Sequence, residues 1–466
     1  MKISFVKISR TSRIYILGAA ECVALTICSR SFGDRGGPYF MVSLTVAGIA
    51  YLLAIREFLA PPKFERRVAK RVVVFGLVLA AVWNIAFLRV PSGPDDDIHR
   101  YVWDGRLQRL GYNPYLIIPS DPAAERLHTA ETRNLNNPDL PTPYPAGAEL
   151  FFRAVTAIQE SIFALKVAFV LCEFAIVFVL VDLLRRNERG AHLVLAYSWN
   201  PLLAIEVAGS GHIDIVGTLL LVISVAALAR RWRPTAAVAF GLAVAVKFLP
   251  IVLLPLYWKR IRIRDAALAV AVVGVLYVPF LHRGRLPIGS LDAYVQSFRF
   301  NGPVFAVLDH VAAPQLLVGL AVLVGFFTAA WFRKNFTTDV GTGSCVGISA
   351  SPVRRAQRAE FLPDALAWPM AASLLCAPVV FPWYLLWLLP FLVSLSTLPI
   401  IVWTVAIIPT YVMWHFRALG RPWGALPVWV MLLEYGCVAT AGAILTLSSL
   451  KRARTRRSSR KVEVMK

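Results

Sequence analysis

The sequence predicts an all-α polytopic integral membrane protein with about 12 transmembrane helices. Of its 466 residues, 58% are hydrophobic and only 16% are charged, and the mean hydropathy is +0.62. Runs of about 20 apolar residues, the length that crosses a bilayer as a helix, recur along the chain. The net charge of +22 comes from Lys and Arg in short clusters between these runs, as in loops held on the cytoplasmic side. This placement argues against nucleic-acid binding.

The first helix is expected to be retained. The basic start MKISFVKISRTSR runs directly into apolar residues, and no small-residue cleavage site of the A-x-A kind follows. The six cysteines show no paired metal-type spacing, so we expect neither a disulfide framework nor a zinc site.

The apolar runs give the candidate spans in order. They cover approximately residues 14–32, 39–58, 72–90, 163–184, 191–208, 213–229, 235–257, 265–281, 311–332, 362–378, 380–397, 398–416 and 425–447.

Basic clusters orient these spans. Lysines and arginines within residues 2–13 and 63–71 hold the N-terminus and the loop after the second helix inside. The third helix therefore exits, and residues 91–145 lie outside. Arginines within 185–189 are inside again, and the GSGHID stretch at 209–214 is outside.

The candidate at 235–257 breaks this alternation, because basic clusters flank it on both sides. The VKFLP stretch at 246–250 offers a solution, with Lys247 at mid-membrane depth and Pro250 interrupting the helix. Irregular backbone at that depth is tolerated only inside protein or beside a cavity. We therefore expect a re-entrant or broken helix here and about twelve crossings in all, with both termini cytoplasmic.

The sequence indicates one transmembrane domain over residues 1–450, followed by a basic cytoplasmic tail over 451–466. Within the domain, the longest polar stretches are an extracytoplasmic loop at 91–145 and a cytoplasmic loop at 333–360. Glycines in the cytoplasmic loop predict flexibility.

The extracytoplasmic loop opens with three adjacent carboxylates. A helix over about 95–110 is predicted, with Pro94 at its start and with Asp97, Arg100 and Asp104 on one face. An apolar stripe on another face predicts that this helix lies on the membrane surface. The acids could simply cap the helix and solvate the loop. Alternatively, one of them is a base at the membrane–water boundary, which takes a proton from an acceptor hydroxyl.

Further ionisable and aromatic residues lie at membrane depth or beside it. Glu206, His212 and Asp214 stand at the outer end of two helices, either as a polar turn or as part of a site. Lys247 lies within an apolar run, where pairing with an anion is favoured. Any bound lipid phosphate would need such cationic partners, which the sequence offers in Arg100, Arg106, His212 and Lys247.

Two further features bear on the ligand. Trp383 and Tyr384 could form part of an interfacial aromatic belt or line a groove for sugar or lipid. The chain has no Gly-rich phosphate loop and no Rossmann fingerprint, so a nucleotide-sugar donor is not expected.

Five motifs occur in an order that resembles the GT-C superfamily of glycosyltransferases, and in particular bacterial polyprenyl-phosphate-mannose-dependent mannosyltransferases. They are DDIHRYVWDGRLQRLGYNPY, TPYPAGAELFF, WNPLLAIEVAGSGHID, VKFLPIVLLPL and FPWYLLWLLPFL, and the resemblance covers roughly residues 70–400. It implies a GT-C-like fold, a sugar donor on a polyprenyl phosphate, and Asp96 or Asp97 as the base. Relatives often have Tyr-Pro-Pro where this chain has Tyr144-Pro145-Ala146, so that turn is expected to differ.

The expected function is transfer of a hexose, with mannose as the first candidate, from a polyprenyl phosphate to a lipid-linked or cell-envelope glycan. The site would face the extracytoplasmic side of a bacterial plasma membrane. A lipid-linked sugar flippase or transporter is the alternative. No cofactor is required, and a divalent metal on the acidic cluster is left open. The expected catalytic residues are Asp96 and Asp97, and the expected substrate-binding residues are Arg100, Asp104, Arg106, Tyr144, His212, Asp214, Lys247, Trp383 and Tyr384.

Overall fold

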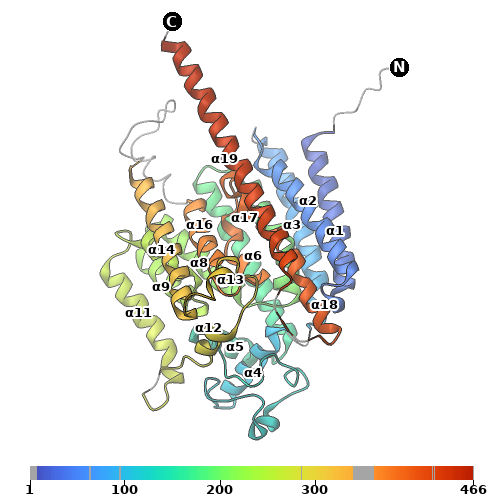
Figure 1. Ribbon diagram of the computed structural model, residues 1–466, viewed down its shortest axis with the longest axis vertical. Coiled ribbons are helices and arrows are strands. Elements are labelled where there is room, and N and C mark those ends of the chain that lie inside the picture. The colour runs from blue at the N-terminus through green and yellow to red at the C-terminus, as the bar shows by residue number, and fades with distance from the viewer. Residues whose placement is uncertain are drawn as a thin grey trace.

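The computed structural model describes residues 8–61, 64–93, 96–284, 286–338, 362–421, 423–424 and 426–464. Within these ranges the named elements are helices, most of them aligned along one axis (Figure 1). The predicted all-α class is confirmed.

Eight helical stretches in the described residues are long and apolar enough to cross a membrane. A ninth is added if the bent pair Leu203–Gly209 and α8 (Asp214–Ala229), which meet at 114°, forms one span. The eight are α1 (Arg10–Arg30), α2 (Pro38–Leu59), α3 (Arg66–Leu88), α6 (Ile162–Arg186), α11 (Ile263–Tyr277) with its continuation to Phe280, α14 (Pro314–Thr338), the stretch Leu395–Ala418 containing α17 (Leu398–Ala406) and α18 (Val412–Ala418), and α19 (Val428–Val464).

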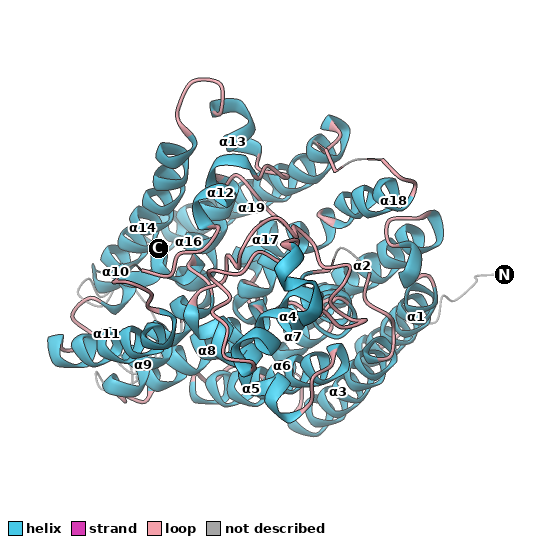
Figure 2. Cartoon of the chain, turned by 90° about the horizontal axis from the view of Figure 1, so that it is seen from below, coloured by secondary structure: helices cyan, strands magenta, loops and turns pink. Residues whose placement is uncertain are grey.

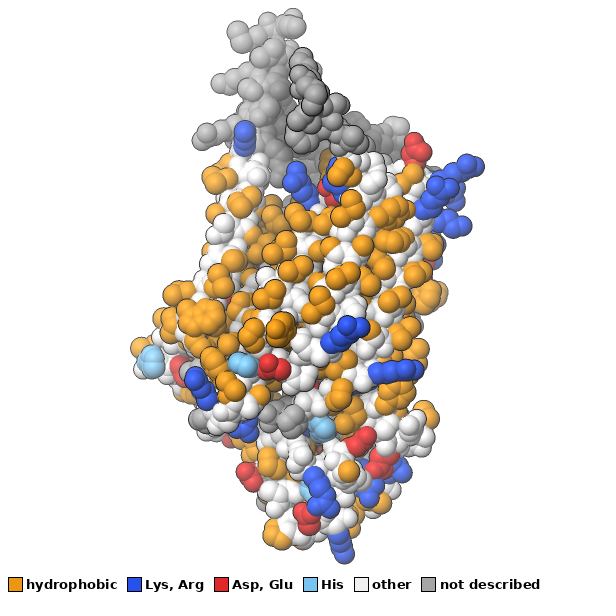
Figure 3. Space-filling view, turned by 90° about the vertical axis from the view of Figure 1, so that its right-hand side faces the viewer, with side chains coloured by type: hydrophobic (Ala, Val, Ile, Leu, Met, Phe, Trp, Pro, Cys, Tyr) orange, Lys and Arg blue, Asp and Glu red, His pale blue; other side chains and the backbone are white. Residues whose placement is uncertain are grey.

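Large apolar side chains cover the outside of these helices. Phe178 on α6, Val270 on α11 and Leu432 on α19 are 76%, 72% and 70% exposed. Figure 3 shows a broad hydrophobic band between two ends that carry charged side chains. A band of this size matches a lipid environment, not water. The chain is a multi-pass membrane protein.

The predicted count of twelve crossings is not confirmed, because four of the apolar runs form no helix long enough to cross by itself. The runs at 213–229 and 362–378 form only the shorter helices α8 and α16 (Pro363–Leu375), and two further runs are divided. The run at 191–208 is divided into short helices, and the run at 380–397 contains the 3-10 helices Pro382–Trp387 and Leu389–Phe391. The side chains of both are largely buried inside the bundle. Hydropathy alone does not separate contact with lipid from contact with protein, and these runs are apolar because protein surrounds them.

The predicted break at 246–250 is present. Helix α9 (Arg233–Val246) ends before Lys247, whose backbone is extended with φ −160° and ψ 144°. The chain continues through the short helix Leu249–Leu253 and α10 (Leu254–Tyr257). Pro250 lies in the first turn of the continuing piece, where its missing N–H costs no hydrogen bond.

The extracytoplasmic loop of the sequence interpretation folds into α4 (Asp97–Arg109), a short 3-10 helix at Pro122–Leu127 and α5 (Ala146–Ile158). Figure 1 shows α4 and α5 at the end of the bundle opposite the start of α1 and the end of α19. Figure 2, seen from that end, shows α4 over the middle of the bundle.

The prediction that α4 lies on a membrane surface is wrong. Its apolar residues Trp103 and Leu107 are fully buried and pack against Ala124, Leu127 and Leu135 of the same loop. The other side of α4 packs closely on α5. A Cβ atom at Gly105 would lie 2.7 Å from the Phe152 carbonyl oxygen, so only glycine permits this approach.

Two parts of the sequence interpretation fall partly outside the described residues, and a third differs from the structure. Pro94 and Asp95 lie outside the described residues, and α4 begins at Asp97 with Asp96 as its N-cap residue. Most of the predicted cytoplasmic loop at 333–360 also lies outside them, since α14 is described only to Thr338. Helix α19 continues to Val464, through most of the stretch predicted as a tail.

Candidate active site

A cavity of about 490 Å³ lies where α4, α8, α12 (Leu291–Ser297) and the 382–387 helix meet. Its size is typical of small-molecule sites. The predicted site residues that line it are Asp97, Arg100, Tyr144, Asp214, Lys247, Trp383 and Tyr384, whereas Asp96, Asp104, Arg106 and His212 do not line it.

The two adjacent carboxylates Asp96 and Asp97 have different surroundings. Asp96 is 3% exposed and is paired with Arg35 at 2.6 Å, and it also accepts a hydrogen bond from the Gly93 backbone N–H at 2.7 Å. Asp97 is half-buried on the cavity wall and accepts a hydrogen bond from the Asn136 side-chain amide at 2.5 Å. Of these two acids, only Asp97 is within reach of a ligand in the cavity.

Arg100 supports the cavity wall through its contacts with protein. Its Nη2 donates to the Leu140 carbonyl at 2.6 Å and its Nη1 to the Asn137 carbonyl at 3.4 Å. Its Nε donates to Asp104 at 3.3 Å, and both side chains are buried. Much of the donor capacity of Arg100 is therefore used to hold residues 136–140 beside Asp97.

Lys247 and Asp214 form an ion pair on the cavity wall. The ammonium group lies 2.8 Å and 2.9 Å from the two carboxylate oxygens. Asp214 also accepts from the Trp387 indole at 2.7 Å, and Lys247 lies 4.0 Å from the centre of the Tyr384 ring. The extended backbone at Lys247 therefore brings a cation from the broken helix α9 to the first turn of α8.

His212 lies behind this wall. Its Nδ1 is 2.9 Å from Glu206, which also accepts a hydrogen bond from the Tyr411 hydroxyl. The imidazole stacks on Trp383 with ring centres 3.9 Å apart, and Trp383 faces the cavity. The structure thus places His212 as a support for Trp383, in contrast to the direct phosphate contact that the sequence suggested.

The comparisons with known proteins bear on this arrangement. Residues 21–261, more than half of the chain, match the model of the MptA/B family, described as alpha-(1->6)-mannopyranosyltransferase, N-terminal domain. The chain belongs to this mannosyltransferase family. The match contains Asp97, Asp214 and Lys247, and it confirms the recognition of a membrane glycosyltransferase from the order of its motifs.

Two other comparisons add less. A similar solved structure is that of ArnT from Cupriavidus metallidurans bound to undecaprenyl phosphate, with 16% sequence identity and a TM-score of 0.41 over 80% of this chain and 74% of that chain. No curated protein sequence matches the chain.

One predicted substrate-binding residue of this mannosyltransferase, Arg106 on α4, lies away from the cavity. Arg106 donates to Glu160 at 2.6 Å and to the Leu127 carbonyl at 2.8 Å. It therefore connects α4 to the end of the Pro122–Leu127 helix and to the turn between α5 and α6, and it does not line the cavity.

The sequence interpretation missed several residues that line the cavity. Asn136 contacts Asp97, and the hydroxyl groups of Tyr294 and Tyr384 are hydrogen-bonded to each other. Trp414, Arg417 and Trp423 also line it. These residues follow no periodicity and form no motif, and they reach the cavity from segments distant in sequence. Only the tertiary fold identifies them.

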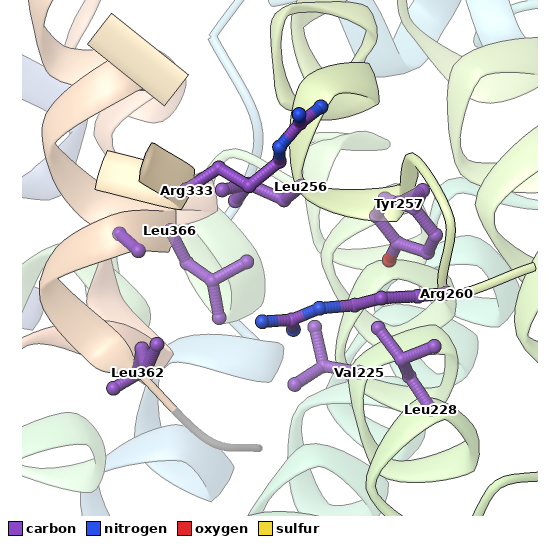
Figure 4. A pocket seen from close by; sticks show the side chains of 9 residues that line it. Val225, Leu228, Leu256, Tyr257, Arg260, Arg333, Leu362 and Leu366 are labelled. Atoms are coloured by element: carbon purple, nitrogen blue, oxygen red, sulfur yellow. The ribbon is translucent and has the colours of Figure 1, made fainter. Parts of the chain in front are cut away.

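A second cavity, of about 30 Å³, lies at the other end of the bundle between α8, α10, α14 and α16 (Pro363–Leu375). Figure 4 shows leucine and valine side chains around it, with the Arg260 side chain extending between them and Arg333 near Leu256. This volume holds about one water molecule, so it offers no room for a sugar.

The sequence leaves open whether the acidic residues 95–97 bind a divalent metal. No three His, Cys, Asp or Glu side chains converge on a possible metal position in the part of the chain that the structure describes. Asp95 lies outside that part. The pairing of Asp96 with Arg35 also removes one candidate ligand.

Asp104 and Glu149 are neighbouring buried carboxyls beneath Arg100. Burial raises the pKa of Asp104 to about 6, although Arg100 opposes this. Burial and the charge of Asp104 raise the pKa of Glu149 well above its ordinary value of 4.5. The folded protein thus keeps protons that the unfolded chain has released. These two carboxyl groups therefore make their full contribution to the free energy of unfolding below their ordinary pKa values. That contribution is lost as pH rises through their folded-state pKa values.

We expect Glu149→Gln to fold and to reduce the fall in Tm between roughly pH 5 and pH 8. An amide stays neutral and still accepts a hydrogen bond from Thr142 or Gln108, which contact Glu149 at 2.7 Å and 2.8 Å. Glu149→Ala leaves those groups without this partner and should cost about 1–3 kcal/mol at every pH. Thermal unfolding of detergent-purified protein at several pH values measures both. Parallel Tm curves for wild type and Glu149→Gln would contradict the expectation.

Proposed function

We propose that the protein transfers mannose from a polyprenyl-phosphate donor to a hydroxyl group of a lipid-linked or cell-envelope glycan on the extracytoplasmic face of a bacterial plasma membrane. The observation that supports this most is the position of Asp97, a carboxylate on the wall of a cavity that also contains a cation and an apolar side. The family description supports mannose as the sugar.

In the proposed reaction, Asp97 accepts the proton of the acceptor hydroxyl as its oxygen bonds to C1 of the sugar. The bond from C1 to the phosphate oxygen breaks, and the polyprenyl phosphate leaves with the electron pair. One displacement inverts C1, so an α-linked product requires a β-linked donor. A double displacement would need a second carboxylate as nucleophile. Asp214 is a poor candidate, because Lys247 and Trp387 occupy its oxygens.

The donor phosphate is placed at Lys247 in this proposal. Its ammonium group is a cation on the cavity wall at the break after α9, and Tyr294 and Tyr384 also line the cavity. A cation and hydroxyl donors stabilise the charge that develops on a leaving phosphate.

The two sides of the cavity suit different parts of the substrates. Leu249, Leu291 and Val318 line the cavity from α14 and from two helices that pack against α14, and they form an aliphatic side suited to a hydrocarbon chain. Trp383, Trp414 and Trp423 form an aromatic side, and indole faces suit the C–H faces of sugar rings. We place the carrier lipid on the first side and the glycan acceptor on the second.

The location on the outer face rests on charge and on the positions of the helix ends. The basic clusters at 63–71 and 185–189 lie where α2 meets α3 and where α6 ends. The positive-inside bias assigns these turns to the cytoplasm. Helices α4 and α5, which carry or flank the cavity, lie at the opposite end (Figure 1).

The test is sugar transfer by purified protein in vesicles, supplied with radiolabelled polyprenyl-phosphate-mannose and a membrane-lipid extract. Parallel reactions contain glucose or arabinose carriers, and one contains EDTA. We expect label from the mannose carrier in a new glycolipid, with or without EDTA. Movement of the carrier across the vesicle membrane without transfer from any sugar would support a flippase and overturn the proposal.

We expect Lys247→Met to raise the KM for the donor by about 10- to 100-fold, the loss of one charge-assisted hydrogen bond. Because this change also leaves Asp214 without its cation, the matched control is Lys247→Met with Asp214→Asn. The double variant should recover the wild-type Tm while its donor KM stays high. A donor KM that recovers with the Tm would show that Lys247 acts only on stability.

A further inference from the structure

Residues 136–140 pass beside Asp97 and contact it. We propose that Asn136 is a positioning residue for transfer, which fixes the orientation of the Asp97 carboxylate, and that Arg100 holds the segment that carries Asn136. This inference rests on the proposed role of Asp97 as the base.

The hydrogen bond between Asn136 and Asp97 involves one particular oxygen of the carboxylate. The Asn136 side-chain amide donates to Oδ1 of Asp97 at 2.5 Å. Asp97 begins α4, where its backbone is fixed by the helix, so rotation about the terminal side-chain bond is its main freedom. A hydrogen bond to one oxygen restricts that rotation. The second oxygen is then directed to accept the proton from the acceptor.

Three hydrogen bonds to backbone carbonyls hold the segment 136–140 in place. Arg100 donates to the carbonyls of Asn137 and Leu140, and the Ser120 N–H donates to the Pro138 carbonyl at 2.9 Å. Asn137 has φ 46°, a left-handed conformation that asparagine adopts more readily than most residues. These contacts fix the backbone from which the Asn136 side chain extends.

The support continues below Arg100. Asp104, fully buried, accepts from Arg100, so the guanidinium is fixed between one carboxylate and two backbone carbonyls. A displacement of about 1 Å of a reacting group can cost roughly 100-fold in rate. The role of Arg100 and Asp104 in this inference is therefore to limit such displacement, without contact with the sugar.

The test uses Asn136→Asp, which keeps the shape of the side chain but replaces the donor by a second acceptor facing Asp97. Asn134→Asp is the matched control, because it places the same charge two positions earlier, at an exposed residue that does not line the cavity. Each variant is assayed in the transfer reaction above, and donor binding is measured separately with unlabelled polyprenyl phosphate.

We expect Asn136→Asp to lower kcat by about 100-fold with the donor KM and the carrier affinity within about threefold of wild type, and Asn134→Asp to keep kcat within about threefold. Asn136→Ala, which removes the donor without adding charge, should show a smaller loss in kcat. A normal kcat for Asn136→Asp, or equal losses in both aspartate variants, would overturn the inference. Absence of transfer by wild type would instead overturn the proposed function.

Should Asn136→Asp fail to fold, Asn136→Ala carries the test alone. Its Tm is compared with that of wild type, and a fall in kcat at unchanged Tm and unchanged donor KM is the expected result. A normal kcat for this variant also overturns the inference.

Discussion

Asp97→Asn is expected to lower kcat for mannose transfer by about 10³-fold, within the usual contribution of a general base. The amide keeps the shape of the side chain but accepts no proton from the acceptor hydroxyl. Donor binding should persist, because the proposed phosphate site at Lys247 lies in a different segment, at the break after α9. Single-turnover transfer of radiolabel, together with carrier binding, measures the two effects separately.

Asp97→Glu serves as the companion variant, since it retains a carboxylate at a shifted position. It should transfer more slowly than wild type but faster than Asp97→Asn. If Asp97→Asn transfers at the wild-type rate, another group is the base. If it loses carrier binding to the same extent as transfer, the residue acts in binding and not in proton transfer.

Asp96→Asn is expected to act on stability, with a loss of about 3–5 kcal/mol in the free energy of unfolding. The carboxylate of Asp96 pairs with Arg35 at 2.6 Å, and the two side chains are only 3% and 7% exposed. Without it the guanidinium would remain buried near the buried Lys166, and it would keep only neutral contacts such as the Ser210 hydroxyl and the Phe32 ring. Thermal unfolding in detergent checks the expected fall in Tm.

The double variant Arg35→Gln with Asp96→Asn provides the control. Removing both charges eliminates the unpaired buried cation, so the double variant should be more stable than Asp96→Asn alone. Its kcat should then lie near that of wild type once the protein is folded. A normal Tm for Asp96→Asn, or a loss of kcat at normal stability, would contradict the assignment of Asp96 to structure.

The sequence predicted what depends on local pattern. Most of the lipid-exposed helices were identified from their apolar runs, and the break at Lys247 was predicted from charges on both sides of one run. Asp97 and Asp214 were assigned to one face from the ends of their helices, and Lys247, expected at mid-membrane depth, was offered as a cationic partner for a phosphate. These inferences need only composition, helix length and the distribution of basic residues.

Other features depend on partners that are far away in the chain. Asp96 and Asp97 differ in their surroundings because Arg35 pairs with Asp96, and Arg35 lies in the turn between α1 and α2. The run at 380–397 was predicted to cross the membrane, because hydropathy does not show whether protein or lipid surrounds an apolar segment. The structure buries it in protein. Asn136 carries no motif, and its importance arises from one contact across 39 positions of sequence.

The ion pair of Lys247 with Asp214 has a consequence for turnover. In the proposed reaction the bound carrier changes from a phosphodiester with one negative charge to a phosphate monoester that can carry two, so a lone cation would hold the product more strongly than the substrate. Asp214 lies 2.8 Å from the same ammonium group and competes for it at every stage. Asp214 therefore competes with the spent carrier for Lys247. This competition limits product inhibition and favours release of the lipid back into the membrane.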